Sequence, residues 1–153
     1  MRDYVAMFIL KTILRNKVEI QQVSIVFIHN GSFKYMTRFI KNGVKQSWDA
    51  IDVADAFNDL KKVFKDKIII LKNDDNVDLQ ILQHIFEKKM NEKFDNKIID
   101  ISKEAKLKGH KSTKLSSLLK EYDINIKNNR GLPVSVYKSQ LLFLLASKML
   151  GIR

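Results

Sequence analysis

The sequence predicts a single α/β domain, residues 1–153, in which helices flank a mixed β-sheet. Apolar, β-branched runs alternate along the chain with segments whose apolar residues recur at helical spacing. An Asn30-Gly31 pair between two β-rich runs indicates a tight hairpin. The 153 residues include one proline and five glycines and contain no repeat or low-complexity linker, which favours one continuous domain.

The first predicted strand lies in "YVAMFILKTIL", which has the branched, apolar composition of a buried strand. We expect it to cover Tyr4–Leu10 as the central strand, with Lys11 at its end. The next segment, "VEIQQVSIVFIHNGSFKYMTRFI", predicts two strands joined at Asn30 and Gly31, because these residues tolerate the positive φ angles of a two-residue turn.

Two short strands follow later in the chain. "KIIIL" (Lys67–Leu71) is apolar enough to be buried on both faces, as strands of parallel sheets are. "KIIDI" (Lys97–Ile101) is the next short strand. Ligands of open α/β sheets gather at the carboxyl ends of strands, and both Lys11 and the run Lys72–Asp78 directly follow predicted strands. We therefore expect these two stretches to meet in space.

Helical spacing identifies two amphipathic segments, marked by Val53, Phe57, Leu60 and Phe64 and by Leu82, Ile85, Phe86 and Met90. "STKLSSLLKEY" predicts a third helix with Ser112 or Thr113 as its N-cap. Val134–Leu150 is apolar nearly all round and is expected to be a buried helix. Trp48 is interpreted as a core or rim residue.

The chain is strongly basic. Its 28 lysine and arginine residues exceed its 17 acidic residues, giving a net charge of +11 and an isoelectric point near 9.8. Such an excess favours polyanionic partners, nucleic acid first and an anionic membrane second, although compositional bias alone produces the same charge. The stretch Lys103–Lys114 carries five lysines and one glutamate. It forms either a solvated helix-loop face or a patch that contacts phosphates.

Other chemistries have little support. The absence of cysteine excludes disulfides and thiolate sites. The glycines are scattered, so there is no phosphate-binding glycine loop, and no small-molecule substrate is evident. The three histidines, His29, His84 and His110, are expected to be structural or solvent-facing. The N-terminal segment is a poor signal peptide, and the longest apolar stretch contains Lys148 and is too short to span a bilayer, so we expect a cytoplasmic protein without membrane contact.

Several strings, taken in order, resemble the DEDD 3′–5′ exonucleases of the ribonuclease-H-like fold. "FILKTI" is similar to the Asp-x-Glu-Thr end of that family's first strand, with Ile9 in place of the aspartate and Lys11 in place of the glutamate. "NDDNVD" resembles the second motif, with Asp78 as its aspartate. "KLKGHKSTKLSSLLKEYDI" is similar to the helix before the third motif. In "RGLPVS", Arg130 and Ser135 stand for the third motif's histidine and aspartate. The resemblance implies a ribonuclease-H-like mixed sheet.

The resemblance also implies a degenerate active site. The family uses four carboxylates to hold two divalent metals, and only Asp78 remains of the four. Lys11 would place a cation where a metal belongs, so we expect a Lys11–Asp78 salt bridge, no catalytic residue, no cofactor and no Mg²⁺ binding. An alternative is that Asp74, Asp75 and Asp78 recruit a metal in an unfamiliar geometry. The favoured interpretation is a solvated acidic cluster at the start of a helix, where the helix dipole explains these acids without a metal.

The expected function is that of a catalytically inactive exonuclease-fold protein that binds single-stranded or end-containing DNA or RNA through a basic groove. The cations expected to contact phosphates are Lys11, Lys72, Lys108, Lys111, Lys114 and Arg130. One alternative is a protein-interaction module or regulator in a replication, repair or phage-related system, with a protein as the partner. A weaker alternative is residual metal-dependent 3′–5′ exonuclease activity.

Overall fold

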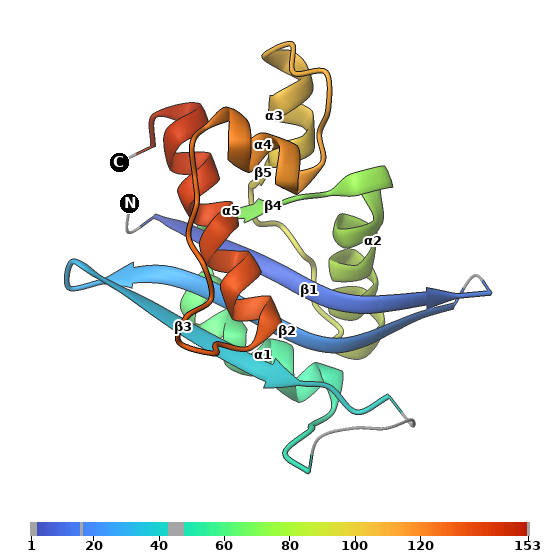
Figure 1. The fold of residues 1–153 in the computed structure, drawn as a ribbon. Helices are drawn as coiled ribbons and strands as arrows, with labels where there is room; N and C mark the ends of the chain where they lie inside the picture. The colour runs from blue at the N-terminus through green and yellow to red at the C-terminus, as the bar shows by residue number, and fades with distance from the viewer. Residues whose placement is uncertain (1–2, 16, 43–47, 153) are drawn as a thin grey trace.

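A computed structural model describes residues 3–15, 17–42 and 48–152 and shows a mixed sheet with helices on both faces (Figure 1). The sheet has the strand order β3-β2-β1-β4-β5. Its strands are β1 (Tyr4–Leu14), β2 (Lys17–His29), β3 (Ser32–Phe39), β4 (Ile68–Leu71) and β5 (Ile98–Asp100). The first three strands pair antiparallel, whereas β4 runs parallel to both β1 and β5. The predicted α/β class and the central place of the first strand are confirmed.

The β2–β3 turn forms where the Asn-Gly pair predicted it. Asn30 and Gly31 have φ angles of 52° and 76°, and His29 pairs with Ser32 across the turn. Both turn residues therefore lie in the left-handed region, which matches the right-handed twist of the strands they join.

The helices are α1 (Val53–Phe64), α2 (Val77–His84), α3 (Ile101–Leu107), α4 (Leu115–Glu121) and α5 (Val134–Leu150). A short 3₁₀ turn, η1 (Asp74–Asn76), precedes α2, and a π-helical turn, η2 (Ile85–Lys89), extends it. Within the described ranges, no helix is long and apolar enough to cross a membrane.

The alternation of side chains along β1 divides the core into two layers. Val5, Met7 and Ile9 pack on the face covered by α1 and by the α2–η2 helix, whereas Ala6 lies with Phe143 on the face covered by α5. Burying one such large apolar side chain stabilises the fold by about 1.5–3 kcal/mol. Because α5 is buried along most of its length, its position on the sheet is fixed, as the apolar sequence of Val134–Leu150 predicted.

The end of β1 and the start of α4 differ from expectation. Strand β1 continues past Lys11 to Leu14, because β2 begins at Lys17 and pairs with it to the end of the hairpin; a register shift between Leu10 and Lys11 accommodates the extension. Helix α4 begins later than expected: Lys114 occupies the N-cap position, and its N–H donates to Ser112 Oγ at 3.2 Å.

Trp48 is not a core or rim residue. Its side chain is 96% exposed, the highest value among the exposed large apolar residues of the described ranges. It lies in the loop between β3 and α1, outside both apolar layers. Sequence composition alone favoured burial, since tryptophan is usually well buried, and no periodic pattern placed this residue on a strand or helix.

Candidate functional site

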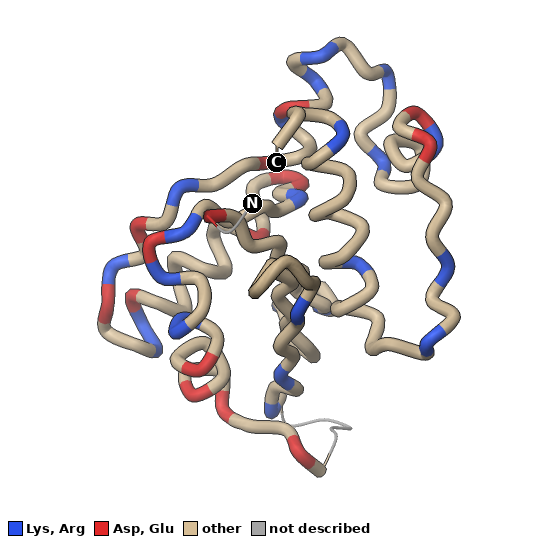
Figure 2. Tube along the Cα trace, turned by 90° about the vertical axis from the view of Figure 1, so that its left-hand side faces the viewer, with Lys and Arg blue, Asp and Glu red and all other residues tan. Residues whose placement is uncertain are grey.

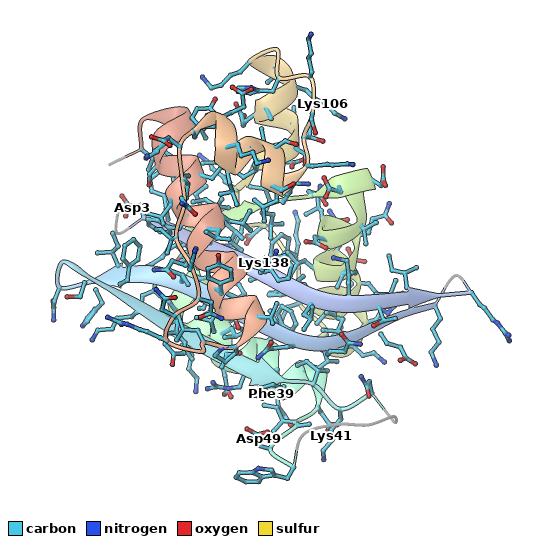
Figure 3. The ribbon with its side chains drawn as sticks, viewed as in Figure 1. Asp3, Phe39, Lys41, Asp49, Lys106 and Lys138 are labelled. Atoms are coloured by element: carbon cyan, nitrogen blue, oxygen red, sulfur yellow. The ribbon has the colours of Figure 1, made fainter. Side chains whose placement is uncertain are left out.

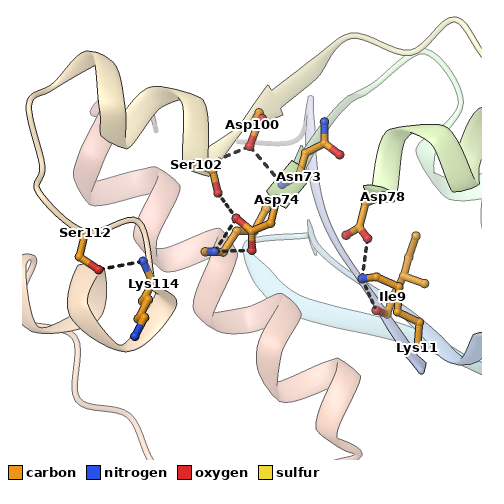
Figure 4. A network of polar contacts seen from close by, with 10 residues as sticks. Ile9, Lys11, Asn73, Asp74, Asp78, Asp100, Ser102, Ser112 and Lys114 are labelled. Carbon is orange, nitrogen blue, oxygen red and sulfur yellow. Dashed lines mark hydrogen bonds and ion pairs between the residues drawn. The ribbon is translucent and has the colours of Figure 1, made fainter. Parts of the chain in front are cut away.

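Lys11 and Asp78 form an ion pair between the central strand and the start of α2. Lys11 Nζ lies 2.6 Å from Asp78 Oδ1, and the two side chains are 21% and 8% exposed (Figure 4). The ammonium also lies 3.5 Å from the carbonyl oxygen of Ile9. The β1 and Lys72–Asp78 stretches therefore meet, as their positions in the sequence predicted.

The environment of Asp78 disfavours its charge in part. Burial raises the pKa of Asp78, and the nearby carboxylates of Asp74 and Asp100 raise it further, while the hydrogen bond and charge of Lys11 lower it. The net direction is upward. A buried carboxylate of this kind depends on its one cationic partner.

A second polar cluster joins the end of β4 to the start of α3. Lys72 Nζ donates to both carboxylate oxygens of Asp74, at 2.8 and 2.6 Å, and Ser102 Oγ donates to Asp74 Oδ1 at 2.5 Å. Asp100 Oδ1 accepts from the backbone N–H groups of Asn73 and Ser102, at 3.1 and 3.0 Å. These contacts fix the loop after β4 (Figure 4).

The pKa of Asp74 is shifted in the opposite direction to that of Asp78. Partial burial raises the pKa of Asp74, but hydrogen bonds from Lys72 and Ser102 and the positive charges of Lys72 and Lys11 outweigh that effect, so the net pKa is lowered. Asp74 is therefore ionised at neutral pH, and its charge is balanced chiefly by Lys72.

Next to this cluster lies an open cavity of about 740 Å³. One part of its lining is the loop after β4, and another part, the α3–α4 wall, comes from α3 and from the residues directly before α4. We call it the lysine pocket, after the four lysines that line it: Lys72, Lys103, Lys106 and Lys114. The lining also includes three aspartates, Asp74, Asp75 and Asp100.

The positive charge of the lysine pocket is concentrated on one wall. Lys72 is held by Asp74, whereas Lys103, Lys106 and Lys114 are exposed and, within the described ranges, lie within 4.0 Å of no carboxylate. Figure 2 shows several lysines along the segment that joins α3 and α4, with few acids between them. An anion would therefore be attracted to the α3–α4 wall.

The structure separates the sequence-predicted site residues. Lys72 and Lys114 line the lysine pocket, while Lys108 and Lys111 lie outside its lining, in the connection between α3 and α4. Lys11 is engaged by Asp78 beside it. Lys103 and Lys106 were not among the cations expected to contact phosphates, although their i, i+3 spacing in the lysine-rich stretch was a usable signal. Figure 3 places Lys106 on α3, far from the β3 edge.

The side chains of Ile9, Arg130 and Ser135 do not join those of Lys11 and Asp78 in a common polar site. Ile9 is 1% exposed and packs in the core under α1. Arg130 lies beside β2 and β3, where it lines a different, smaller cavity. Ser135 is fully buried at the start of α5, with its hydroxyl 2.5 Å from that of Ser24. Its role here is to satisfy buried polar groups between α5 and the sheet.

The arrangement of acids offers no evident metal site. Among the residues that the structure describes, no group of three or more His, Cys, Asp or Glu side chains is arranged to hold a metal ion. That this chain binds Mg²⁺ weakly, if at all, remains a prediction.

No protein-family model matches the sequence, and no curated protein matches it. A solved structure matches with a TM-score of 0.65 and 14% sequence identity, and the match covers 98% of this chain and 79% of that chain. It is described as the yeast NOT1 MIF4G domain co-crystallized with CAF1. At this identity the similarity shows a shared fold alone.

These comparisons overturn the assignment to the DEDD exonuclease family. The assignment depended on the order of short strings, and strand ends followed by helix starts recur throughout α/β proteins. The family's site is also not assembled here. Ile9 is buried in the core, and Lys11 forms an ion pair with Asp78. Arg130 and Ser135 lie in other parts of the structure. The family identification was wrong.

Proposed function

We propose that the domain is a non-catalytic nucleic-acid-binding protein that holds phosphates at the lysine pocket. The observation that carries the proposal is that Lys103, Lys106 and Lys114 line one cavity wall, with no carboxylate partner among the residues that the structure describes. The ammonium group of lysine binds phosphate directly, without a metal. The net charge of +11 adds long-range attraction for a polyanion.

The contacts of two acids that line the lysine pocket support the same proposal. Asp74 is bound by Lys72 and Ser102, and Asp100 accepts from two backbone N–H groups. These acids already have donors, so their repulsion of an approaching phosphate is reduced. Phosphates would therefore contact the α3–α4 wall, and the acids would keep the loop after β4 in place.

Catalysis by a pair of metals has no comparable support. A two-metal site needs several carboxylates, and Asp78, the one acid expected at such a site, is 2.6 Å from Lys11 Nζ. A cation at that distance opposes the approach of a divalent metal. We therefore propose binding without strand cleavage.

The ribonuclease-H-like form of the fold is part of this proposal. Support comes from the strand order β3-β2-β1-β4-β5, in which an antiparallel hairpin and two parallel strands flank the central β1. An experimental structure in which Ile9 and Asp78 lie far apart would contradict it.

The test is a binding titration with single-stranded and duplex DNA and RNA at several salt concentrations. The triple substitution Lys103→Gln, Lys106→Gln and Lys114→Gln should weaken binding and reduce the salt slope by about one per lysine. The matched control is Lys65→Gln, Lys88→Gln and Lys93→Gln, which removes the same charge from exposed positions away from the lysine pocket. Equal losses in both variants, or no binding by the wild-type chain, would overturn the proposal.

A protein-interaction role is the second candidate, and the exposure of Trp48 favours it. An apolar side chain that is 96% exposed is unusual, and tryptophan is enriched at binding hot spots. The matched solved structure is itself described as a domain co-crystallized with another protein. Trp48 is the single tryptophan of the chain, so a blue shift of its fluorescence would report its burial by a protein partner.

A further inference from the structure

A second surface combines aromatic and cationic side chains at the β2–β3 end of the sheet. Phe33 and Tyr35 are 46% and 50% exposed, and both belong to the edge strand β3. They line a cavity of about 120 Å³ together with Lys34 and Arg130. We call this surface the aromatic patch; the acid-free lining of its cavity distinguishes it from the lysine pocket.

The two rings are presented on one side of β3. Residues two apart on a strand project from the same face, so Phe33 and Tyr35 lie on the face that α5 covers in part. The rings of Phe33 and of Phe143 in α5 pack in a T-shaped arrangement, with centroids 5.3 Å apart and an interplanar angle of 87°. This contact holds Phe33, whereas Tyr35 remains half exposed.

Arg130 is brought to the aromatic patch by a turn of defined geometry. The side chain of Asn128 closes this turn: its amide donates to the carbonyl oxygen of Leu132, and its oxygen accepts from the Leu132 N–H, each at 2.8 Å. Gly131 follows Arg130 with a φ of +63°, a conformation that favours glycine. Figure 1 shows the segment between α4 and α5 passing in front of β2 and β3.

We propose that Tyr35, Phe33 and Arg130 bind an unpaired base of a single-stranded nucleic acid. Exposed aromatic rings stack on bases of any sequence, and a guanidinium beside them contacts either a base face or a phosphate. Because the turn at Asn128 positions the backbone of Arg130 before binding, less backbone freedom is lost on binding. This inference rests on the proposed function, to which it adds a single-stranded ligand.

The test compares two fluorescent probes of equal length: a strand of about ten thymidines, and an abasic strand with the same phosphates. The wild-type chain should bind the thymidine strand about tenfold more tightly, because only that strand can stack. Tyr35→Ala should remove most of this difference, and Tyr35→Phe should keep it. Trp48→Ala is the control, since it removes another exposed aromatic ring outside the aromatic patch.

The outcomes separate this inference from the proposed function. Equal binding of both strands by the wild-type chain, with a salt slope that depends on the lysine pocket, would overturn the inference and leave the proposed function standing. Retention of the thymidine preference in Tyr35→Ala, with the fold intact by circular dichroism, would also overturn it. If neither strand binds to the wild-type chain, both the inference and the proposed function are overturned.

Discussion

The Nζ atom of Lys11 lies 2.6 Å from Oδ1 of Asp78, and this contact joins the central strand to the first turn of α2. Both groups are largely removed from solvent. A lone carboxylate at this position would be costly, and the lysine offsets that cost. The ion pair therefore makes the polar site between β1 and α2 stable without a metal.

Removing the lysine should destabilise the fold. Lys11→Met leaves Asp78 buried without its cation, so we expect the free energy of unfolding in urea to fall by about 2 kcal/mol. In the double variant Lys11→Met and Asp78→Leu, no buried charge remains, and much of the loss should be recovered. A double variant no more stable than Lys11→Met would show that the pair contributes by another route.

The carboxylate of Asp74 should make stability sensitive to acid. Its pKa is lowered in the folded state from an ordinary value of 3.8, so its contribution is complete above that value and is lost as the pH falls toward the folded pKa. Asp74→Asn should therefore lose stability at about pH 7 and show a smaller further loss on acidification. Urea midpoints across this pH range measure both effects.

The control for this experiment is Asp95→Asn, which removes an exposed acid from a different part of the surface. It should leave the acid dependence close to that of the wild-type chain. The same acid dependence in wild type and Asp74→Asn would mean that the contacts from Lys72 and Ser102 contribute little in solution.

Sequence signals predicted the fold best where the signal was local. Asn30 and Gly31 predicted the β2–β3 turn, because the positive φ angles needed there restrict the residue types. The meeting of Lys11 and Asp78 was expected from two strand ends at one edge of a sheet, and the two residues do meet although β1 continues past Lys11 to Leu14. The extension of β1 to Leu14 was missed because pairing with β2, rather than the composition of β1, determines where that strand ends.

The candidate sites were harder to predict because they depend on tertiary placement. Arg130 was assigned to the site of Lys11 by its order in a motif, yet the turn at Asn128 carries it to β3. Lys103 and Lys106 belonged to a lysine-rich stretch whose solvated and phosphate-binding interpretations were indistinguishable in sequence. The folded structure separates them: Lys103, Lys106 and Lys114 line the cavity between β4 and α3, whereas Lys108 and Lys111 do not.

Within that stretch, position should matter more than charge. Lys103→Gln with Lys106→Gln removes two lysines from the lysine pocket, and Lys108→Gln with Lys111→Gln removes two that lie outside its lining. The first pair should reduce the salt slope of DNA or RNA binding by about two, and the second pair by less than one. Glutamine supports helix formation as well as lysine does, so α3 should persist in the first pair.

A larger effect of the second pair would move the phosphate contacts to the connection between α3 and α4, outside the lysine pocket. Equal effects of the two pairs would indicate attraction by net charge alone. Fluorescence anisotropy with one labelled single strand, repeated at several salt concentrations, distinguishes these results.

Divalent metal should not strengthen binding and should not produce cleavage. A two-metal site needs several carboxylates, and here the ammonium of Lys11 neutralises Asp78 while Lys72 neutralises Asp74. Calorimetry with Mg²⁺ or Mn²⁺ should therefore show weak binding at most, and affinity for a labelled strand should fall slightly as the added salt screens charge. Two tight divalent sites would contradict this prediction. Nuclease activity that survives repurification and disappears in Asp78→Ala would also contradict it, because that result would require Asp78 to release Lys11 and bind metal.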